Sequence, residues 1–550
     1  MNAARLDSLL LTAIAAIISV GALIYYYHQG AILLYGDAVA HINIARRVFD
    51  SRTPGLLQLG TVWLPLPHVL DIPFIVNDRM WQSGVGASIA SMIAYVAGTL
   101  GVFRLVRGLA SRAAAWLAAL VYALNPNLIY MQATAMTEAL YLALFVWAVV
   151  YFSEFAREAG DDPARAHRSL TKCGIAVSAA MLVRYDGWFL AAVMAVSALI
   201  VVWRVYSIAP GSSGAKAQVN FASGFPPAIE AGASTKSGAS ADVGSIRPQA
   251  FPHSGRLLRS GLVNFILLTG ITAVSFLVYN QLAFGNALEF VKGPSSPRAI
   301  QERSKTPTMQ TYPGENSPRG AALQFLKISR LNIAAGRTEK LLFTTGFVAL
   351  LAVIYFSRKF LPWATLWTPV AFYVLCIAWG SVPIYHPEWW PFSYYNVRYG
   401  LQLLPAIAAF VALAVEFAGR FLPVRVVAAA AVLMVTASYW SVWNTTPVSL
   451  REAIANGRER MALEEALAIE LRKLPASATI MMDCSAHSGA VQLAGIHFSR
   501  VLRESNPPFW ETALTQPAQS ADYVVVFPGD IVERAVQRSP EGLRQVAIIG

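Results

Sequence analysis

The chain has 550 residues, of which 56% are hydrophobic and only 13% are charged, and its mean hydropathy is +0.48. Because soluble domains usually carry about 25% charged residues, this composition excludes an ordinary soluble protein and indicates a polytopic membrane protein. The formal net charge of +12 would suggest nucleic acid as a partner of a soluble chain. In a membrane protein the simpler explanation is that cytoplasmic loops collect lysine and arginine, and the sequence has no nucleic-acid-binding pattern. The three cysteines, Cys173, Cys376 and Cys484, are far apart and predict neither disulfides nor a metal site.

The hydropathy pattern predicts eleven membrane-spanning helices. The first 27 residues hold one arginine and then an apolar run of about 19 residues without a cleavage site, which predicts an uncleaved first span. Later spans are expected at about 84–103, 113–131, 136–153, 261–281, 341–357, 362–380, 400–418 and 424–442, with two more in 171–203 that separate at 184–188. With the N-terminus inside, the short basic loops face the cytoplasm, and the long loops at about 28–83 and 284–340 face outward.

Two regions differ in composition from the spans. Residues 207–255 are rich in Gly, Ala, Ser and Pro without periodicity, which predicts a disordered cytoplasmic linker. Residues 446–550 contain an amphipathic helical pattern at 457–474 and short apolar runs at 478–483 and 522–527. They predict a small C-terminal α/β domain outside the membrane, and no glycine-rich phosphate loop assigns it a nucleotide. The expected fold class is therefore a polytopic α-helical membrane protein with a small α/β domain.

The stretch 34–47 directly follows the first span and contains Asp37 and His41. Asp37 is placed to cap a short helix, and the alternation of apolar and polar positions predicts that this helix lies in the membrane interface. Asp37 and His41 are four residues apart and share a helical face, so they form a candidate acid/base pair. The alternative is that Asp37 is only a helix cap and His41 only an interface histidine. Further along the same loop, the prolines on either side of Leu66 argue against a continuous helix.

Three more polar clusters are expected at outward-facing helix ends. Glu138 begins the fourth span, where a carboxylate could serve only to favour the helix dipole. Arg184 and Asp186 lie between the fifth and sixth spans, where they could form only a local ion pair. Arg398 and Tyr399 lie at the start of the tenth span. An arginine at a helix start opposes the dipole, and a guanidinium group suits a phosphate.

These features resemble the GT-C superfamily of integral-membrane glycosyltransferases, which includes the family 39-like protein O-mannosyltransferases and the aminoarabinose transferases that modify lipid A. The resemblance covers residues 1–445 and rests on the 34–47 stretch and on the motifs MTEALY, RYDGW, FGNALEF and NVRYGLQLLP in this order. The sequence departs from the family where its usual acidic pair after the first span, Asp-Glu, is Asp37 followed by Ala38. The linker and the C-terminal domain are additional.

The resemblance implies transfer of a sugar, with inversion, from a polyprenyl-phosphate carrier to an acceptor on the periplasmic side. Asp37 would be the general base, and Glu138 and His41 would orient the acceptor or Asp37. The residues that would bind the departing phosphate are Arg398, Tyr399 and Arg184. The further candidates for substrate binding are His68, Asp186, His386 and Glu388. The long loop at 284–340 would act as a lid. Asp37 and Glu138 are also possible oxygen ligands of a divalent metal ion, and the resemblance leaves metal dependence open.

Two other classes of function remain as alternatives. One is a transporter or flippase of a lipid-linked or small anionic substrate, which would place charges near the bilayer midplane. The other is an envelope assembly scaffold that acts through the C-terminal domain. The short loops and the lack of a targeting signal favour a bacterial inner membrane. The sequence specifies neither the sugar nor the acceptor, which could be a lipid, a glycan or a protein.

Overall fold

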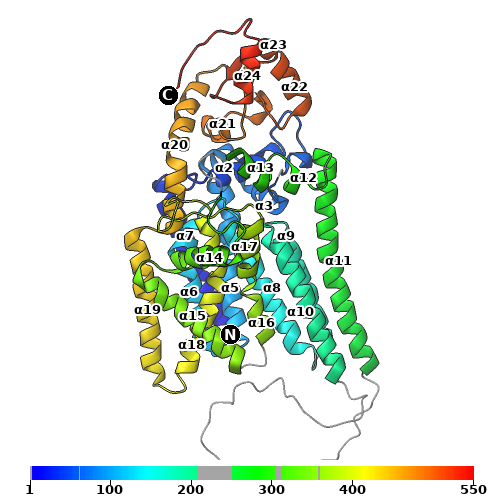
Figure 1. The fold of residues 1–550 in the computed structure, drawn as a ribbon, viewed down its shortest axis with the longest axis vertical. Helices are drawn as coiled ribbons and strands as arrows, with labels where there is room; N and C mark the ends of the chain where they lie inside the picture. The colour runs from blue at the N-terminus through cyan, green and yellow to red at the C-terminus, as the bar shows by residue number, and fades with distance from the viewer. Residues whose placement is uncertain (1–2, 61, 209–250, 305–310, 357–359, 550) are drawn as a thin grey trace, which may run out of the picture.

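The computed structural model describes residues 3–60, 62–208, 251–304, 311–356 and 360–549. Most of the predicted linker, 207–255, therefore lies outside the described residues. Figure 1 shows an elongated molecule in which long helices run side by side and a smaller sheet-containing region caps one end. We call this capped end the outer end and the opposite end the inner end.

Each of the eleven predicted spans corresponds to a helix. These helices are α1 (Ala3–His28), α5 (Val85–Arg107), α6 (Arg112–Ala123), α8 (Glu138–Glu158), α9 (Pro163–Met181), α10 (Asp186–Ile208), α11 (Phe251–Phe284), α15 (Arg337–Phe356), α17 (Thr368–Trp379), α18 (Leu404–Ala418) and α19 (Val424–Thr445). Seven candidate spans among the described residues are long and apolar enough to cross a membrane. Of the others, α6 and α17 are short, and α9 and α15 carry several charges near their first turns. The chain is therefore an integral membrane protein with the predicted helical fold class.

Three predicted spans are interrupted. Pro126 cannot donate a backbone hydrogen bond, so the third span stops and restarts as α7 (Pro126–Met131). The ninth span is divided into α16 (Phe360–Thr365) and α17, and the tenth begins as the 3₁₀ helix η3 (Val397–Leu403). These breaks place polar side chains at helix ends.

The centre of the bundle packs closely because small residues face large ones. A Cβ on Gly98 of α5 would lie 2.5 Å from the hydroxyl oxygen of Tyr122 on α6, and a Cβ on Gly101 would lie 2.8 Å from Val146 on α8. Glycine at these positions lets the helices approach, as is common between membrane helices. By contrast α11 leaves large apolar side chains such as Ile271 exposed, as expected of a lipid-facing helix.

The first outer loop is mostly helical, which corrects two predictions. It contains α2 (Gly36–Arg47), η1 (Leu56–Gln58), α3 (Pro65–Ile75) and α4 (Asp78–Ser83). The prolines on either side of Leu66 do not prevent a helix, because Pro65 and Pro67 both lie in the first turn of α3, where no backbone donor is needed. The polar face of α2 does not face open water or lipid head groups. It is buried against the C-terminal region.

The second outer loop is also more ordered than a polar loop. It contains α12 (Glu289–Lys292), α13 (Pro297–Ser304) and α14 (Pro318–Ile333). Helix α14 packs against η3 and α17 and buries one whole face. This helix is therefore part of the core beneath the outer end, which argues against a lid role for this part of the loop.

The C-terminal region begins with α20 (Val448–Leu471) and contains a three-stranded parallel sheet. Its remaining elements are β1 (Ile480–Met482), α21 (Ser488–Ala494), η4 (Phe498–Arg500), β2 (Val501–Leu502), α22 (Pro507–Thr515), α23 (Pro517–Ser520), β3 (Tyr523–Val525) and α24 (Ile531–Arg538). The strand order is β2-β1-β3, with Ile480 opposite Val501 on one side and Tyr523 on the other. The predicted strands at 478–483 and 522–527 are present, and β2 and α21 are additional.

A ring of three side chains joins the C-terminal region to the first outer loop. Asn43 of α2 donates from Nδ2 to Gln492 of α21 at 3.0 Å, and Gln492 donates to the carbonyl of Trp81 at 2.9 Å. Trp81 Nε1 then donates to Asn43 Oδ1 at 2.9 Å. Buried amide groups satisfied in this way fix the domain on the α2 helix.

Candidate functional site

Charged side chains from five parts of the chain meet at the outer end of the bundle. They form what we call the outer cluster: Asp37, Glu138, Arg184, Asp186, Arg398 and Glu452. They come from α2, the first turn of α8, the turn between α9 and α10, η3, and the second turn of α20. Charged residues from all four clusters predicted at separate helix ends, Asp37, Glu138, Arg184 with Asp186, and Arg398, thus belong to one constellation.

Arg398 is the centre of this cluster. Its Nη2 lies 2.5 Å from Asp37 Oδ2, its Nη1 lies 2.9 Å from Glu452 Oε1, and its Nε lies 3.3 Å from Glu138 Oε1. Its backbone N–H also donates to Glu452 Oε2 at 3.1 Å. Three carboxylates therefore offset the unfavourable position of this cation at a helix start, and the charge-assisted bonds fix its fork geometry.

Buried asparagines hold the backbone that presents Arg398. Asn396, just before η3, has a φ of 57°, a left-handed conformation that asparagine tolerates. Asn332 of α14 donates to the carbonyl of Val397 at 2.7 Å. Asn125 and Asn127, at the break between α6 and α7, in turn donate to the carbonyl of Asn332 at 2.9 Å. The interrupted helices thus supply the polar groups that fix η3.

Arg184 is the centre of a second group of contacts, which shares Glu138 with the first. Its Nη1 lies 3.0 Å from Glu138 Oε1, and its Nε lies 3.2 Å from Asp186 Oδ1. Its Nη2 donates to the Tyr373 hydroxyl at 3.0 Å, which donates to Asp186 Oδ2 at 3.0 Å. The same oxygen of Glu138 therefore bridges both arginines, while its Oε2 is buried without a hydrogen-bond partner among the described residues.

Aromatic rings separate and support the two guanidinium groups. The ring centroid of Tyr399 lies 4.7 Å from the guanidinium carbon of Arg184 and 5.2 Å from that of Arg398. Tyr35 lies on another side of Arg398, at 5.0 Å, and its hydroxyl group donates to the carbonyl of Ser449 at 2.7 Å. Such cation–π contacts orient the arginines without supplying a counter-charge.

Asp37 is the accessible member of the cluster. Its side chain is 36% exposed, against 0% for Glu138 and 1% for Glu452. With all members ionised, four carboxylates face two guanidinium groups, so the cluster carries more negative than positive charge. A new ligand can therefore reach this charge network most easily at the Asp37–Arg398 pair.

The predicted Asp37–His41 pair is replaced by other partners. The N-cap of α2 is Tyr35, so Asp37 lies in the first helical turn instead of capping it, and its carboxylate contacts Arg398. His41 contacts a residue of another helix instead, since its Nδ1 lies 2.8 Å from His68 Nε2 on α3. Sequence spacing identifies a shared face on one helix, but here contacts with other helices determine both partners.

The two histidines form a buried neutral pair. His41 and His68 are 2% and 0% exposed. Burial lowers the pKa of His41 to about 4, and burial together with the neighbouring His41 lowers the pKa of His68 well below its ordinary value. With neutral rings, one nitrogen donates to the other, and the pair supports the packing of α2 on α3.

Two candidates lie in a different network. The ring of His386 packs against Trp389 at 4.9 Å, and Glu388 forms an ion pair with Lys327. Lys327 Nζ also lies 2.8 Å from Glu339 Oε1. Burial lowers the pKa of His386 to about 4. The structure therefore does not bring His386 and Glu388 into the outer cluster.

Known proteins share this architecture. A family model described as dolichyl-phosphate-mannose-protein mannosyltransferase matches residues 79–210, which include Glu138, Arg184 and Asp186. The structure of ArnT from Cupriavidus metallidurans bound to undecaprenyl phosphate aligns with a TM-score of 0.52 and 13% identity, over 98% of this chain and 90% of that chain. The chain has the GT-C fold. The predicted resemblance to this superfamily is thereby confirmed.

Two further structures share the GT-C fold. ArnT from the same organism in the apo state aligns with a TM-score of 0.50 and 12% identity, over 98% of this chain and 89% of that chain. The apo oligosaccharyltransferase of Archaeoglobus fulgidus aligns with a TM-score of 0.50 and 14% identity, over 96% of this chain and 68% of that chain. No curated protein sequence matches this chain.

Sequence reasoning did not identify Glu452. It lies on α20, which sequence reasoning assigned to the C-terminal domain, yet its carboxylate binds Arg398 and the hydroxyl of Tyr35, at 2.9 and 3.1 Å. An acidic residue soon after the last span was the available signal. The predicted boundary at 446 therefore precedes a helix that serves both parts of the molecule.

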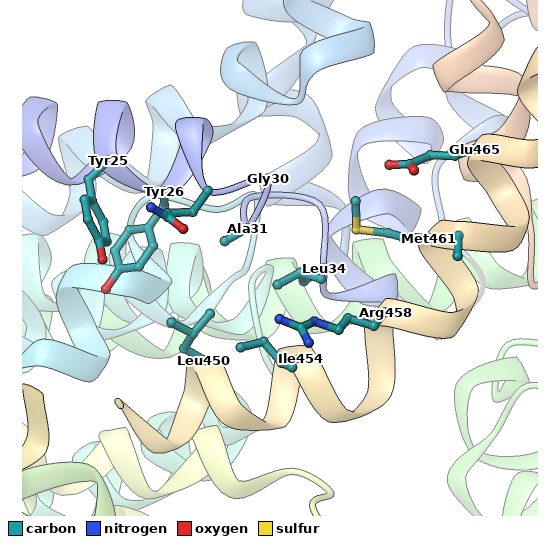
Figure 2. Close-up of a pocket in the computed structure, with 12 residues that line it drawn as sticks. Tyr25, Tyr26, Gly30, Ala31, Leu34, Leu450, Ile454, Arg458, Met461 and Glu465 are labelled. Atoms are coloured by element: carbon teal, nitrogen blue, oxygen red, sulfur yellow. The ribbon is translucent and has the colours of Figure 1, made fainter. Parts of the chain in front are cut away.

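A groove of about 390 Å³ lies between the outer end of α1 and α20 (Figure 2). Tyr25, Leu34, Ile454 and the exposed Arg458 are among its lining residues. None of the six residues of the outer cluster lines this groove. The described residues include no group of three or more His, Cys, Asp or Glu side chains placed to hold a metal ion.

Proposed function

We propose that this protein is a membrane glycosyltransferase that moves a sugar from a polyprenyl-phosphate carrier to an acceptor hydroxyl on the periplasmic side. The observation that carries the proposal is the Asp37–Arg398 pair, because it sets a half-exposed carboxylate beside a guanidinium group at the open edge of a buried charge network. The similarity to ArnT, whose structure contains undecaprenyl phosphate, supports this class of donor.

The reaction needs a base on one side of the sugar and a positive group on the other. Asp37 accepts the proton of the acceptor hydroxyl as its oxygen forms a bond to the anomeric carbon. The bond from that carbon to the phosphate oxygen breaks, and the electron pair leaves with the polyprenyl phosphate. Attack from the face opposite the leaving group inverts the configuration. Arg398 stabilises the charge that develops on the departing phosphate.

Arg398 must exchange partners for this to happen. Its Nη2 is bound to Asp37, whereas its other nitrogens face the buried Glu452 and Glu138. A phosphate arriving from outside would therefore displace the carboxylate of Asp37 from Nη2. This exchange would free Asp37 to act as the base only when the donor is in place. Glu138 and Glu452 would be positioning residues that hold the guanidinium group during the exchange.

This exchange makes a testable distinction between the two residues. Asp37→Asn removes a competitor for Nη2, so the variant should bind undecaprenyl phosphate at least as tightly as the wild type and transfer almost nothing. Arg398→Gln should lose saturable binding. The measurement is binding of undecaprenyl phosphate to the purified full chain in detergent, together with transfer from undecaprenyl-phosphate-linked hexoses and pentoses to an envelope fraction.

Arg458→Gln is the matched control, because this exposed arginine lines the nearby groove outside the outer cluster. Loss of binding in Arg398→Gln with normal binding in Arg458→Gln would support the phosphate site at the cluster. The reverse pattern would place the phosphate in the groove and contradict the proposal. Wild-type binding no stronger than that of phosphatidylcholine would remove its main support.

A further inference from the structure

A second concave site lies at the inner ends of α5, α8 and α9, far from the outer cluster. Helix α8 begins with Glu138 in the outer cluster and ends at Glu158 in this site, a length of about 30 Å at 1.5 Å per residue. The cavity has a volume of about 320 Å³. We propose that this inner pocket binds the phosphate head group of an anionic membrane lipid.

The lining of the inner pocket has an excess of positive charge. Five basic and two acidic side chains line it, with one serine. Glu154 is paired with Arg104 at 2.7 Å. Glu158 accepts a hydrogen bond from Ser169 at 3.0 Å and lies 3.9 Å from Arg165. The two carboxylates of the pocket are thus already engaged, and within the described residues its other three cations, Arg157, Arg168 and Lys172, form no ion pair with a carboxylate.

Arg168 and Lys172 are the cations most available to a ligand. They are four residues apart on α9 and therefore share a face. Both are exposed, and within the described part of the chain neither forms an ion pair with a carboxylate. Lys172 Nζ instead lies 5.8 Å from the ring centroid of Tyr151. Two adjacent donors without counter-ions match the oxygens of a phosphate group.

The surroundings favour a lipid over a soluble anion. The guanidinium carbon of Arg104 lies 5.4 Å from the ring centroid of Trp147 and 5.8 Å from that of Tyr151. Aromatic rings next to cations are typical of the head-group level of a bilayer. Ile175, one turn from Lys172 toward the bundle centre, is 56% exposed. A ligand in the pocket would therefore meet cations at its head and an apolar surface below, as a phospholipid does.

The test compares lipid binding to the purified full chain carrying paired substitutions. Phosphatidylglycerol and phosphatidylcholine are titrated, and retained lipid is measured by native mass spectrometry. The wild type should retain phosphatidylglycerol preferentially. The Arg168→Gln, Lys172→Gln double variant should bind it roughly 30-fold more weakly, since each cation near a membrane surface contributes about 1 kcal/mol. Arg425→Gln is the control, because Arg425 is exposed at the start of α19 on the same inner end and lies outside the pocket.

Three outcomes would overturn the proposal. Equal weakening in Arg425→Gln would show diffuse surface charge instead of a site. Equal retention of both lipids by the wild type would show that the net charge of the lipid head group is not recognised. Displacement of phosphatidylglycerol by millimolar inorganic phosphate would indicate a soluble anion. The double variant should keep transfer activity and undecaprenyl phosphate binding at Arg398, so this inference and the proposed function can fail separately.

Discussion

The two charged sites of this molecule differ in burial and in the sign of their excess charge. In the outer cluster the arginines are buried among carboxylates, and Arg398 is only 8% exposed. In the inner pocket Arg104 and Arg165 are 49% and 63% exposed, and positive charge is in excess. Buried charges are stable only beside fixed partners. Exposed charges are hydrated and screened by salt, so they can remain unpaired until a ligand binds. The comparison therefore predicts chemistry at a rigid outer site and adaptable lipid binding at the inner one.

The largest effect should come from the accessible carboxylate of the outer cluster. Asp37→Asn keeps the volume of the side chain and removes the proposed base, so transfer should fall roughly 10²- to 10⁴-fold. The thermal unfolding temperature should change little, because Asp37 is the most exposed of the cluster's carboxylates. Asp78→Asn is a suitable control, since Asp78 is a half-exposed outer carboxylate paired with Arg46. Comparable loss in both variants would argue for structural damage.

Breaking the buried part of the cluster should mainly cost stability. Glu138 is fully buried and bridges Arg184 and Arg398, so Glu138→Ala leaves two buried cations without a shared partner. Removal of one partner of a buried ion pair typically costs about 3–5 kcal/mol. The corresponding inner substitution, Glu154→Ala, breaks a partly exposed pair with Arg104 and should cost about 1 kcal/mol or less. Thermal or denaturant unfolding in detergent would compare the two, and equal costs would contradict the proposed difference between the sites.

Acid should weaken the outer end through the histidine pair. Burial favours the neutral form of His41 and lowers its pKa from 6.5 to about 4. Its contribution to stability is therefore complete above about pH 6.5 and is lost as the pH falls toward 4. His68→Gln should flatten this loss, because the variant removes one of the two buried neutral rings that take up a proton on unfolding. Unfolding curves between these pH values measure it, with the exposed His28→Gln as control. An unchanged pH profile in His68→Gln would show that the pair does not titrate on unfolding.

Sequence reasoning succeeded where the structure depends on composition or on the side of the membrane at which a helix end lies. Long apolar runs identified the spans, and the placement of Glu138, Arg184 and Arg398 at outward helix ends predicted that they belong to one region. It failed where the partner comes from a distant part of the chain. His41 pairs with His68 of another helix, and Glu452 reaches Arg398 from a helix assigned to another domain. Helical spacing does not predict such contacts, because it describes only one face of one helix at a time.

The smallest expected effect is the difference between the two sites in their response to salt. Phosphatidylglycerol binding at the inner pocket should weaken as NaCl rises from about 0.05 to 0.5 M, because the Debye length shrinks well below the dimensions of the exposed site. The unfolding temperature of the wild type should hardly change over the same range if the buried outer ion pairs are shielded from the electrolyte by the surrounding protein. Native mass spectrometry after equilibration at each salt concentration and parallel unfolding scans provide both measurements. A salt-independent lipid affinity would mean that apolar contacts near Ile175, rather than Arg168 and Lys172, dominate binding, and the inner pocket would lose its role as a charge-selective site.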